Sequence, residues 1–317
     1  MKLQTIFSGE HFSDRAKEAK FQPPWWAQIL LFVLVFSISG APQSIVVCIV
    51  SAVMVMTNNS IENMDQIQDI IMELTKSDPI MIAQLLSTVL TAIIVIIYCK
   101  LIERRSLYSM GFVKKNAVPS YLIGLASGFA MFSATLLISY LAGAAKYVGT
   151  DVYNVGIYVL YCVGWIFQGA EEEIVCRGYF MPSLSTKLPL WAAVLISSLF
   201  FSLMHLFNVG FNLIVLVNLT LTGIMFAVFA IRFNNLWVCC AIHSIWNLVQ
   251  GNFYGLPVSG MYTGPSVFRF ELPEVSELWT GGAFGLEGSL SETIVMVIVI
   301  LAVIFIPKKN KISEISS

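Results

Sequence analysis

The chain has 317 residues, of which 57% are hydrophobic and only 12% are charged, and its mean hydropathy is +0.79. Soluble domains carry about one quarter charged residues, so this composition excludes an ordinary soluble protein and indicates a chain solvated mostly by lipid. The 18 Lys and Arg residues nearly balance the 19 Asp and Glu residues. This balance offers no basic surface for nucleic acid, so we expect no nucleic-acid partner.

We interpret eight apolar segments as membrane spans, for which about 20 residues is the usual length. In chain order they are 25–56, 79–101, 119–143, 152–176, 190–207, 211–231, 234–251 and 292–306. The sequence therefore predicts an all-α fold, a polytopic membrane bundle of eight transmembrane helices.

The first segment exceeds the length of one span and is interrupted by Gly40, Pro42 and Gln43, so it could be one kinked helix or two short ones. The distribution of Lys and Arg residues between the two sides of the membrane distinguishes the one-helix from the two-helix interpretation. With one first span, all but three of the 18 basic residues fall on the side of the N-terminus; the exceptions are Lys76, Lys146 and Arg269. The positive-inside rule then predicts a single first span and both termini in the cytoplasm.

The spans divide the chain into five parts. These are a cytoplasmic N-terminal segment (1–24), N-terminal transmembrane helices (25–118), a core (119–251), an extramembranous Gly-rich loop (252–291), and a last transmembrane helix with a basic tail (292–317). We expect no cleavable signal peptide, because the mixed charges of 1–24 lead directly into an aromatic anchor at Trp25 and Trp26. The long loop is either a cap over a site or a plain connector.

The fourth apolar segment ends in three adjacent carboxylates, Glu171, Glu172 and Glu173. Charges inside a membrane are costly and indicate a function, although a solvated helix end is the alternative. Glu173 and Arg177 have the i, i+4 spacing of a helical ion pair, so we expect Arg177 to neutralise Glu173. Glu172 is turned about 100° away and lacks that partner, which suits a desolvated general base. Glu171 has no predicted role.

Two of the three histidines, His205 and His243, lie in apolar segments. Glu172 and His205 are about equally far from the turn at Pro189, so in an antiparallel hairpin both lie near 25 Å along their helices and could meet. His243 and Asn247 share one helix face at i, i+4. A lone membrane histidine usually serves an interhelical hydrogen bond, but these residues together indicate a site.

Three short motifs occur in order on separate apolar segments: Glu172-Glu173-x-x-x-Arg177, Phe201-x-x-x-His205 and His243-x-x-x-Asn247. Over about residues 119–251 the chain resembles the CPBP family of intramembrane proteases. That family includes the type II CAAX prenyl endopeptidases and many bacterial proteins described as bacteriocin-immunity or lysostaphin-resistance-like. The resemblance implies an integral, multi-pass protein of a bacterial plasma membrane that acts on a membrane-associated peptide or protein.

The resemblance also assigns roles in peptide-bond hydrolysis. Glu172 and His205 activate water, His243 and Asn247 face the developing oxyanion, and Glu173 and Arg177 organise the site. Glu172, His205 and His243 could instead bind Zn²⁺, leaving a fourth position for water, or the reaction could need no metal.

Two further questions stay open at this point. Prenyl endopeptidases of the family open to the cytosol, whereas a continuous fourth helix would carry Glu172 to the middle or outer half of the bilayer. An ion-coupled transporter and a catalytically silent membrane scaffold are the alternative functions, because intramembrane Glu and His also form proton relays and join helices. The substrate itself is not encoded in any motif.

Overall fold

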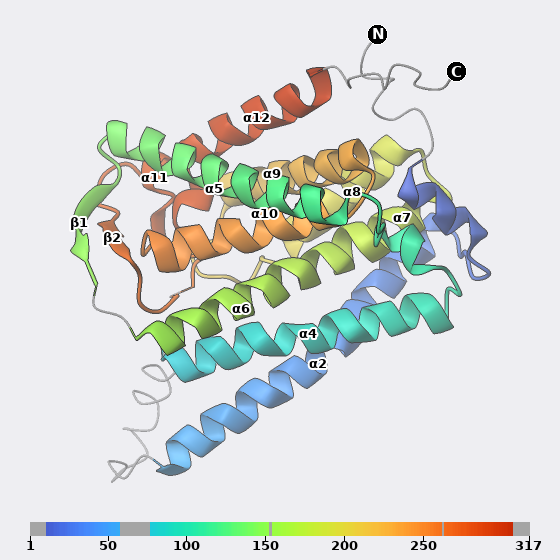
Figure 1. Cartoon of the computed structure of the whole chain (residues 1–317), viewed down its shortest axis with the longest axis horizontal. Helices are drawn as coiled ribbons and strands as arrows, with labels where there is room; N and C mark the ends of the chain where they lie inside the picture. The colour runs from blue at the N-terminus through green and yellow to red at the C-terminus, as the bar shows by residue number, and fades with distance from the viewer. Residues whose placement is uncertain (1–10, 58–76, 152–153, 262, 307–317) are drawn as a thin grey trace, which may run out of the picture.

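The computed structural model describes residues 11–57, 77–151, 154–261 and 263–306. Its helices run side by side as a bundle, with a small sheet at one end (Figure 1). The long helices are α2 (Trp25–Thr57), α4 (Asp78–Leu101), α5 (Ala117–Leu141), α6 (Val155–Glu173), α8 (Leu190–Leu203), α9 (Leu213–Phe233), α10 (Trp237–Leu248) and α12 (Leu290–Phe305). The short ones are η1 (Phe12–Glu18), η2 (Leu107–Met110), η3 (Ile174–Phe180), α7 (Met181–Ser185), η4 (Val249–Phe253), α11 (Glu277–Thr280), η5 (Gly282–Phe284) and η6 (Leu286–Gly288).

Helix α2 runs unbroken from Trp25 to Thr57 with Pro42 inside it, so the prediction of one first helix is confirmed. Among the described residues, four helices are long and apolar enough to cross a membrane, namely α2, α4, α5 and α9. Helices α8 and α12 are apolar but shorter. The class of an integral, helical membrane bundle follows. Eight spans and cytoplasmic termini stay predictions, and the expected basic tail lies outside the described residues.

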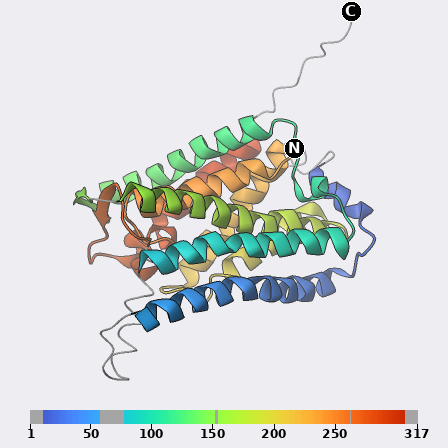
Figure 2. The ribbon, with the colours of Figure 1, turned by 60° about the horizontal axis from the view of Figure 1, so that its bottom comes forward.

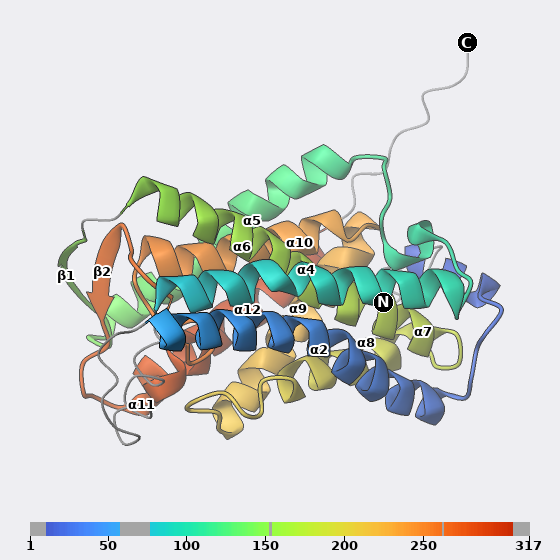
Figure 3. The ribbon, with the colours of Figure 1, turned by 90° about the horizontal axis from the view of Figure 1, so that it is seen from below.

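The helices follow one another across the bundle. Helix α4 packs between α2 and α6, α10 packs between α6 and α5, and α9 packs between α8 and α12. Figures 2 and 3 show α2, in blue, alongside α4 at the edge of the bundle. Small residues permit the closest approaches: a Cβ on Gly128 of α5 would lie 2.6 Å from the Ile242 carbonyl of α10, and one on Gly169 of α6 would lie 2.6 Å from the Ser244 nitrogen.

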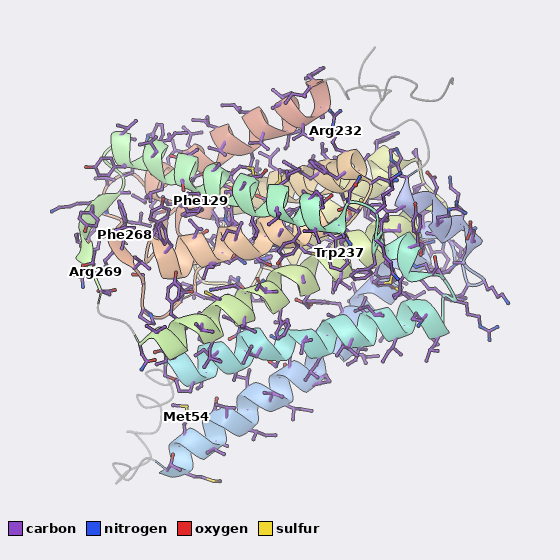
Figure 4. The ribbon with its side chains drawn as sticks, viewed as in Figure 1. Met54, Phe129, Arg232, Trp237, Phe268 and Arg269 are labelled. Atoms are coloured by element: carbon purple, nitrogen blue, oxygen red, sulfur yellow. The ribbon has the colours of Figure 1, made fainter. Side chains whose placement is uncertain are left out.

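A two-stranded sheet joins segments far apart in the chain and was not predicted from the sequence. Strand β1 (Lys146–Thr150) pairs antiparallel with β2 (Phe268–Glu271). Figure 4 places Phe268 and Arg269 of β2 at one end of the bundle, and Arg232 and Trp237 toward the other. We call the first the sheet end. The second, which also holds the C-terminus of α4, α7 and η1, is the basic end.

Helix α6 does not stop where the sequence predicted. After Glu173 the chain continues as a π-helical stretch, η3, and then as α7 to Ser185. Helix α10 makes the same change after Leu248, where the π-helical η4 begins. In contrast, α8 ends at Leu203, and residues 204–212 form turns before α9 begins. Both π-helical stretches therefore follow closely on the helical segments that carry predicted site residues.

Candidate active site

A cavity of about 980 Å³ lies between α2, α4, α6, α10 and the turns that follow α8. Its size is typical of ligand sites in proteins. Four predicted site residues line it: Glu172, His205, His243 and Asn247. Helices far apart in the sequence therefore bring the three motifs to one cavity.

The predicted ion pair between Glu173 and Arg177 is present, with Arg177 Nη1 2.9 Å from Glu173 Oε1 and both side chains fully buried. Arg177 also donates to the Gly223 carbonyl of α9 at 3.0 Å, and its guanidinium lies 4.5 Å from the centre of the Phe201 ring. Burial of this charge is thus offset by a carboxylate, a carbonyl and an aromatic face. The pair fixes the end of α6 against α8 and α9.

His243 connects the acidic cluster to the cavity. Its Nδ1 lies 3.0 Å from Glu173 Oε1, and its Nε2 lies 3.6 Å from Glu172 Oε2. The ring stacks on Phe226 of α9, with centroids 4.9 Å apart. An ionised carboxylate only accepts hydrogen bonds, so Nδ1 carries the proton in the contact with Glu173. This leaves Nε2 facing Glu172.

Glu172 has a partner that the sequence analysis missed. Gln168, one turn earlier on α6, donates from Nε2 to Glu172 Oε1 at 2.6 Å. Asn247 of α10 donates in turn to Gln168 Oε1 at 2.8 Å. The other carboxylate oxygen, Glu172 Oε2, is buried without a hydrogen bond. The only sequence signal for Gln168 was that it is a polar residue, four positions before Glu172, in an apolar helix.

His205 lies just beyond the end of α8. Its Nδ1 is 2.9 Å from the Phe201 carbonyl, which only accepts, so Nδ1 is the donor and Nε2 is left for other contacts. Within the described residues no carboxylate forms an ion pair with His205. Glu172 and His205 thus share the cavity wall, as expected from their similar depth, without touching each other.

The donor set does not have the arrangement of a metal site. Among the described residues, no group of three or more His, Cys, Asp or Glu side chains is placed to hold a metal ion. His243 directs Nδ1 to Glu173, and His205 Nδ1 is bound to a carbonyl. The three predicted zinc ligands, Glu172, His205 and His243, therefore belong to no such group among the described residues.

The loop after α10 forms part of the cavity wall. Ser259 in this loop donates from its backbone N–H to Glu287 Oε2 at 2.5 Å, and its carbonyl accepts from Asn208 in the turns after α8. Gln250 also donates to Glu287 Oε2, at 3.2 Å. Burial raises the pKa of the Glu287 carboxyl. Sequence reasoning missed Glu287 because its neighbours come from distant segments of the chain.

The cavity extends from Glu172 toward the sheet end. The lining residues of α6 lie at or before Glu172, those of α4 lie between Gln84 and Thr91 in its middle part, and Ser259 and Met261 belong to the loop. Toward the basic end the space is filled by aromatic rings. Phe32 of α2 stacks on Phe180 at 4.0 Å between centroids, and both rings contact Phe200 of α8 edge-on.

Fold and cavity together define a helical membrane protein with a buried Glu, His and amide cluster, an arrangement suited to moving protons at a buried site. Residues 154–249 match the family described as type II CAAX prenyl endopeptidase Rce1-like. The matched segment contains every residue of the three motifs, so the predicted resemblance is confirmed over residues 154–249. No curated protein and no solved structure matches the chain.

Proposed function

We propose that the protein is an intramembrane endopeptidase that hydrolyses a peptide bond of a membrane-associated protein or peptide through a water molecule activated by Glu172. The observation that carries this proposal is Glu172 Oε2, a buried carboxylate oxygen without a hydrogen bond at the wall of a large cavity. A carboxylate in this state has a lone pair available to accept a proton from water.

In the proposed reaction, water lies between Glu172 and His205. Glu172 takes the proton as the water oxygen attacks the carbonyl carbon, which forms a tetrahedral intermediate. The carbon–nitrogen bond then breaks, and the same proton passes to the leaving amine. Gln168 holds Glu172 Oε1, so that Oε2 is the oxygen that faces the reaction.

In this proposal Asn247 stabilises the oxyanion, because its amide has two N–H groups and, among the described residues, only the bond to Gln168 uses one of them. A donor of this kind in a dry site lowers the barrier by several kcal/mol, on the order of 3. His243 faces the same space through Nε2, while Glu173 and Arg177 fix the ring from behind.

The test is peptide cleavage by purified protein reconstituted in lipid vesicles. We expect Glu172→Gln to lower kcat by roughly 10²- to 10⁴-fold, with comparable losses for His205→Ala and His243→Ala. Glu292→Gln is the matched control, since Glu292 is buried in α12 and bonded to Thr135 and Thr222 outside the cavity lining. Wild-type rates from all three site variants would contradict the proposal, and a response confined to solute transport would favour the carrier instead.

The question of a metal has its own measurement. Because the predicted ligands do not converge, we expect cleavage to survive complete removal of metal from the purified protein. Metal content by mass spectrometry and activity before and after chelation would be measured on the same sample. Loss of activity on chelation with recovery on added Zn²⁺ would show that the site binds zinc, with the side chains rearranged around it.

A further inference from the structure

Glu171 is the one carboxylate of the acidic cluster without a partner. Its side chain is 6% exposed and lines the cavity. Glu173 pairs with Arg177, and Glu172 is held by Gln168, but no described residue forms a hydrogen bond or ion pair with Glu171. A buried carboxylate left in this state is costly, by several kcal/mol in most settings.

Within the part of the chain that the structure describes, no Lys or Arg side chain is placed to offset that cost. Among the described residues, the cavity lining includes the carboxylates of Glu171 and Glu172 and no Lys or Arg side chain. Arg177, the nearest arginine along the chain, is bound to Glu173 and the Gly223 carbonyl and does not reach the lining. The cavity therefore favours an occupant that brings a positive charge.

We propose that Glu171 binds the side chain of a lysine or arginine in the substrate, close to the bond that is cut. The inference rests on the proposed endopeptidase function and narrows its substrate class to basic peptides. A cation there would also lie beside Glu172, so recognition and the proposed chemistry occupy adjacent parts of one cavity wall.

The position of the basic residue follows from the chain geometry. Glu171 and Glu172 are neighbours on α6, with Cα atoms about 3.8 Å apart and side chains turned about 100° from each other. An extended peptide advances about 3.3 Å per residue. A lysine or arginine within roughly two residues of the scissile bond therefore reaches Glu171 while the bond itself faces Glu172.

The experiment uses reconstituted protein and a set of peptides that differ at one position only, with Lys, Arg, norleucine or Glu placed in turn at each of the two sites on either side of the scissile bond. Norleucine retains the aliphatic length of lysine without its charge. At one position we expect kcat/KM for Lys to exceed that for norleucine by at least about tenfold. In Glu171→Gln this ratio falls to about one, whereas Glu292→Gln keeps the wild-type ratio.

A binding measurement separates this inference from the proposed function. Equilibrium binding of the same peptides is measured with Glu172→Gln protein and with the double variant Glu171→Gln/Glu172→Gln. A preference for Lys over norleucine that is lost only in the double variant supports the cation site, even if no peptide is cleaved. Equal affinity for the two peptides in Glu172→Gln protein, or a preference that survives Glu171→Gln, overturns it.

Discussion

Gln168 is the residue that most extends the site beyond its motifs. It joins the carboxylate of Glu172 to the amide of Asn247 across two helices. Removal of its amide would leave Glu172 Oε1 and Asn247 Nδ2 without these bonds, so that both side chains could adopt other orientations. We infer that Gln168 positions the base rather than taking part in proton transfer.

We therefore expect Gln168→Met, which keeps the length of the side chain but not its hydrogen bonds, to lower kcat by about 10- to 100-fold with a smaller change in KM. Gln43→Met is the control, since Gln43 lines the same cavity from α2 and donates to the Gln84 carbonyl. Steady-state kinetics on both variants would decide the matter. Equal effects from the two substitutions would argue against a role in positioning.

The sequence predicted contacts between single residues where their spacing along one helix decides whether they meet. The Glu173–Arg177 pair follows from an i, i+4 spacing on one helix and is present at 2.9 Å. The contact of His243 with Glu173 was not predicted, because it depends on how α6 and α10 pack. No sequence pattern indicated the contacts of Glu287, since its partners, Ser259 and Gln250, lie in other segments of the chain.

At the scale of helices, the contact between α6 and α10 determines the geometry of the site, because α6 carries the carboxylates and α10 carries His243. Gly169 lies at this contact, where a Cβ would be 2.6 Å from the Ser244 nitrogen and 2.7 Å from its hydroxyl oxygen. Atoms that close cannot coexist, so any side chain at this position moves the two helices apart.

We expect Gly169→Ala to lower the free energy of unfolding of the protein by about 1–3 kcal/mol. We also expect it to reduce activity, because the contact between Glu173 and His243 is weakened. Gly40→Ala serves as the control: no atom lies within 4 Å of the added Cβ, and alanine favours the helix by about 0.5–1 kcal/mol. Thermal unfolding in detergent compares the two. A stable and fully active Gly169→Ala protein would contradict this account of the interface.

Helix positions followed well from hydropathy, whereas details that depend on packing did not. The apolar segment 79–101 became α4 (Asp78–Leu101), close to its predicted bounds. The segment 152–176 instead ends its α-helical part at Glu173, because the change to π-helical winding is not a property of hydropathy. Strands β1 and β2 were missed because each is short and pairs only with a distant partner.

At the scale of the whole molecule, the cavity and the positively charged side chains lie toward opposite ends of the bundle. Lysines and arginines gather at the basic end, where the buried Arg105 forms an ion pair with Glu103, with Nε 2.6 Å from Oε2. The cavity extends toward the sheet end, and the rings of Phe32, Phe180 and Phe200 lie on its other side. If the basic end is cytoplasmic, as the positive-inside rule predicts, substrate reaches Glu172 from the opposite side or from the lipid.

We expect Met261→Cys, at the cavity, to react with a membrane-impermeant maleimide added to intact cells, and Lys187→Cys, which is exposed near the basic end, to react only after permeabilisation. Both would be made with the exposed Cys48 and the half-buried Cys162 replaced by serine. The readout is a shift in gel mobility. The reverse labelling pattern would overturn the predicted orientation, and with it the expectation of cytoplasmic termini.

The π-helical stretch η3 connects the end of α6 to α7 and includes Arg177. Such stretches generally correspond to one residue more than an α-helix would hold over the same length. Loss of a single residue from this stretch would therefore leave an ordinary α-helix of about the same length, and the residues after it would keep their rotation about the helix axis. Phe180 would then stay among the rings of Phe32 and Phe200, whereas the same deletion in the regular part of α6 would turn everything after it by about 100° and would be far less tolerated.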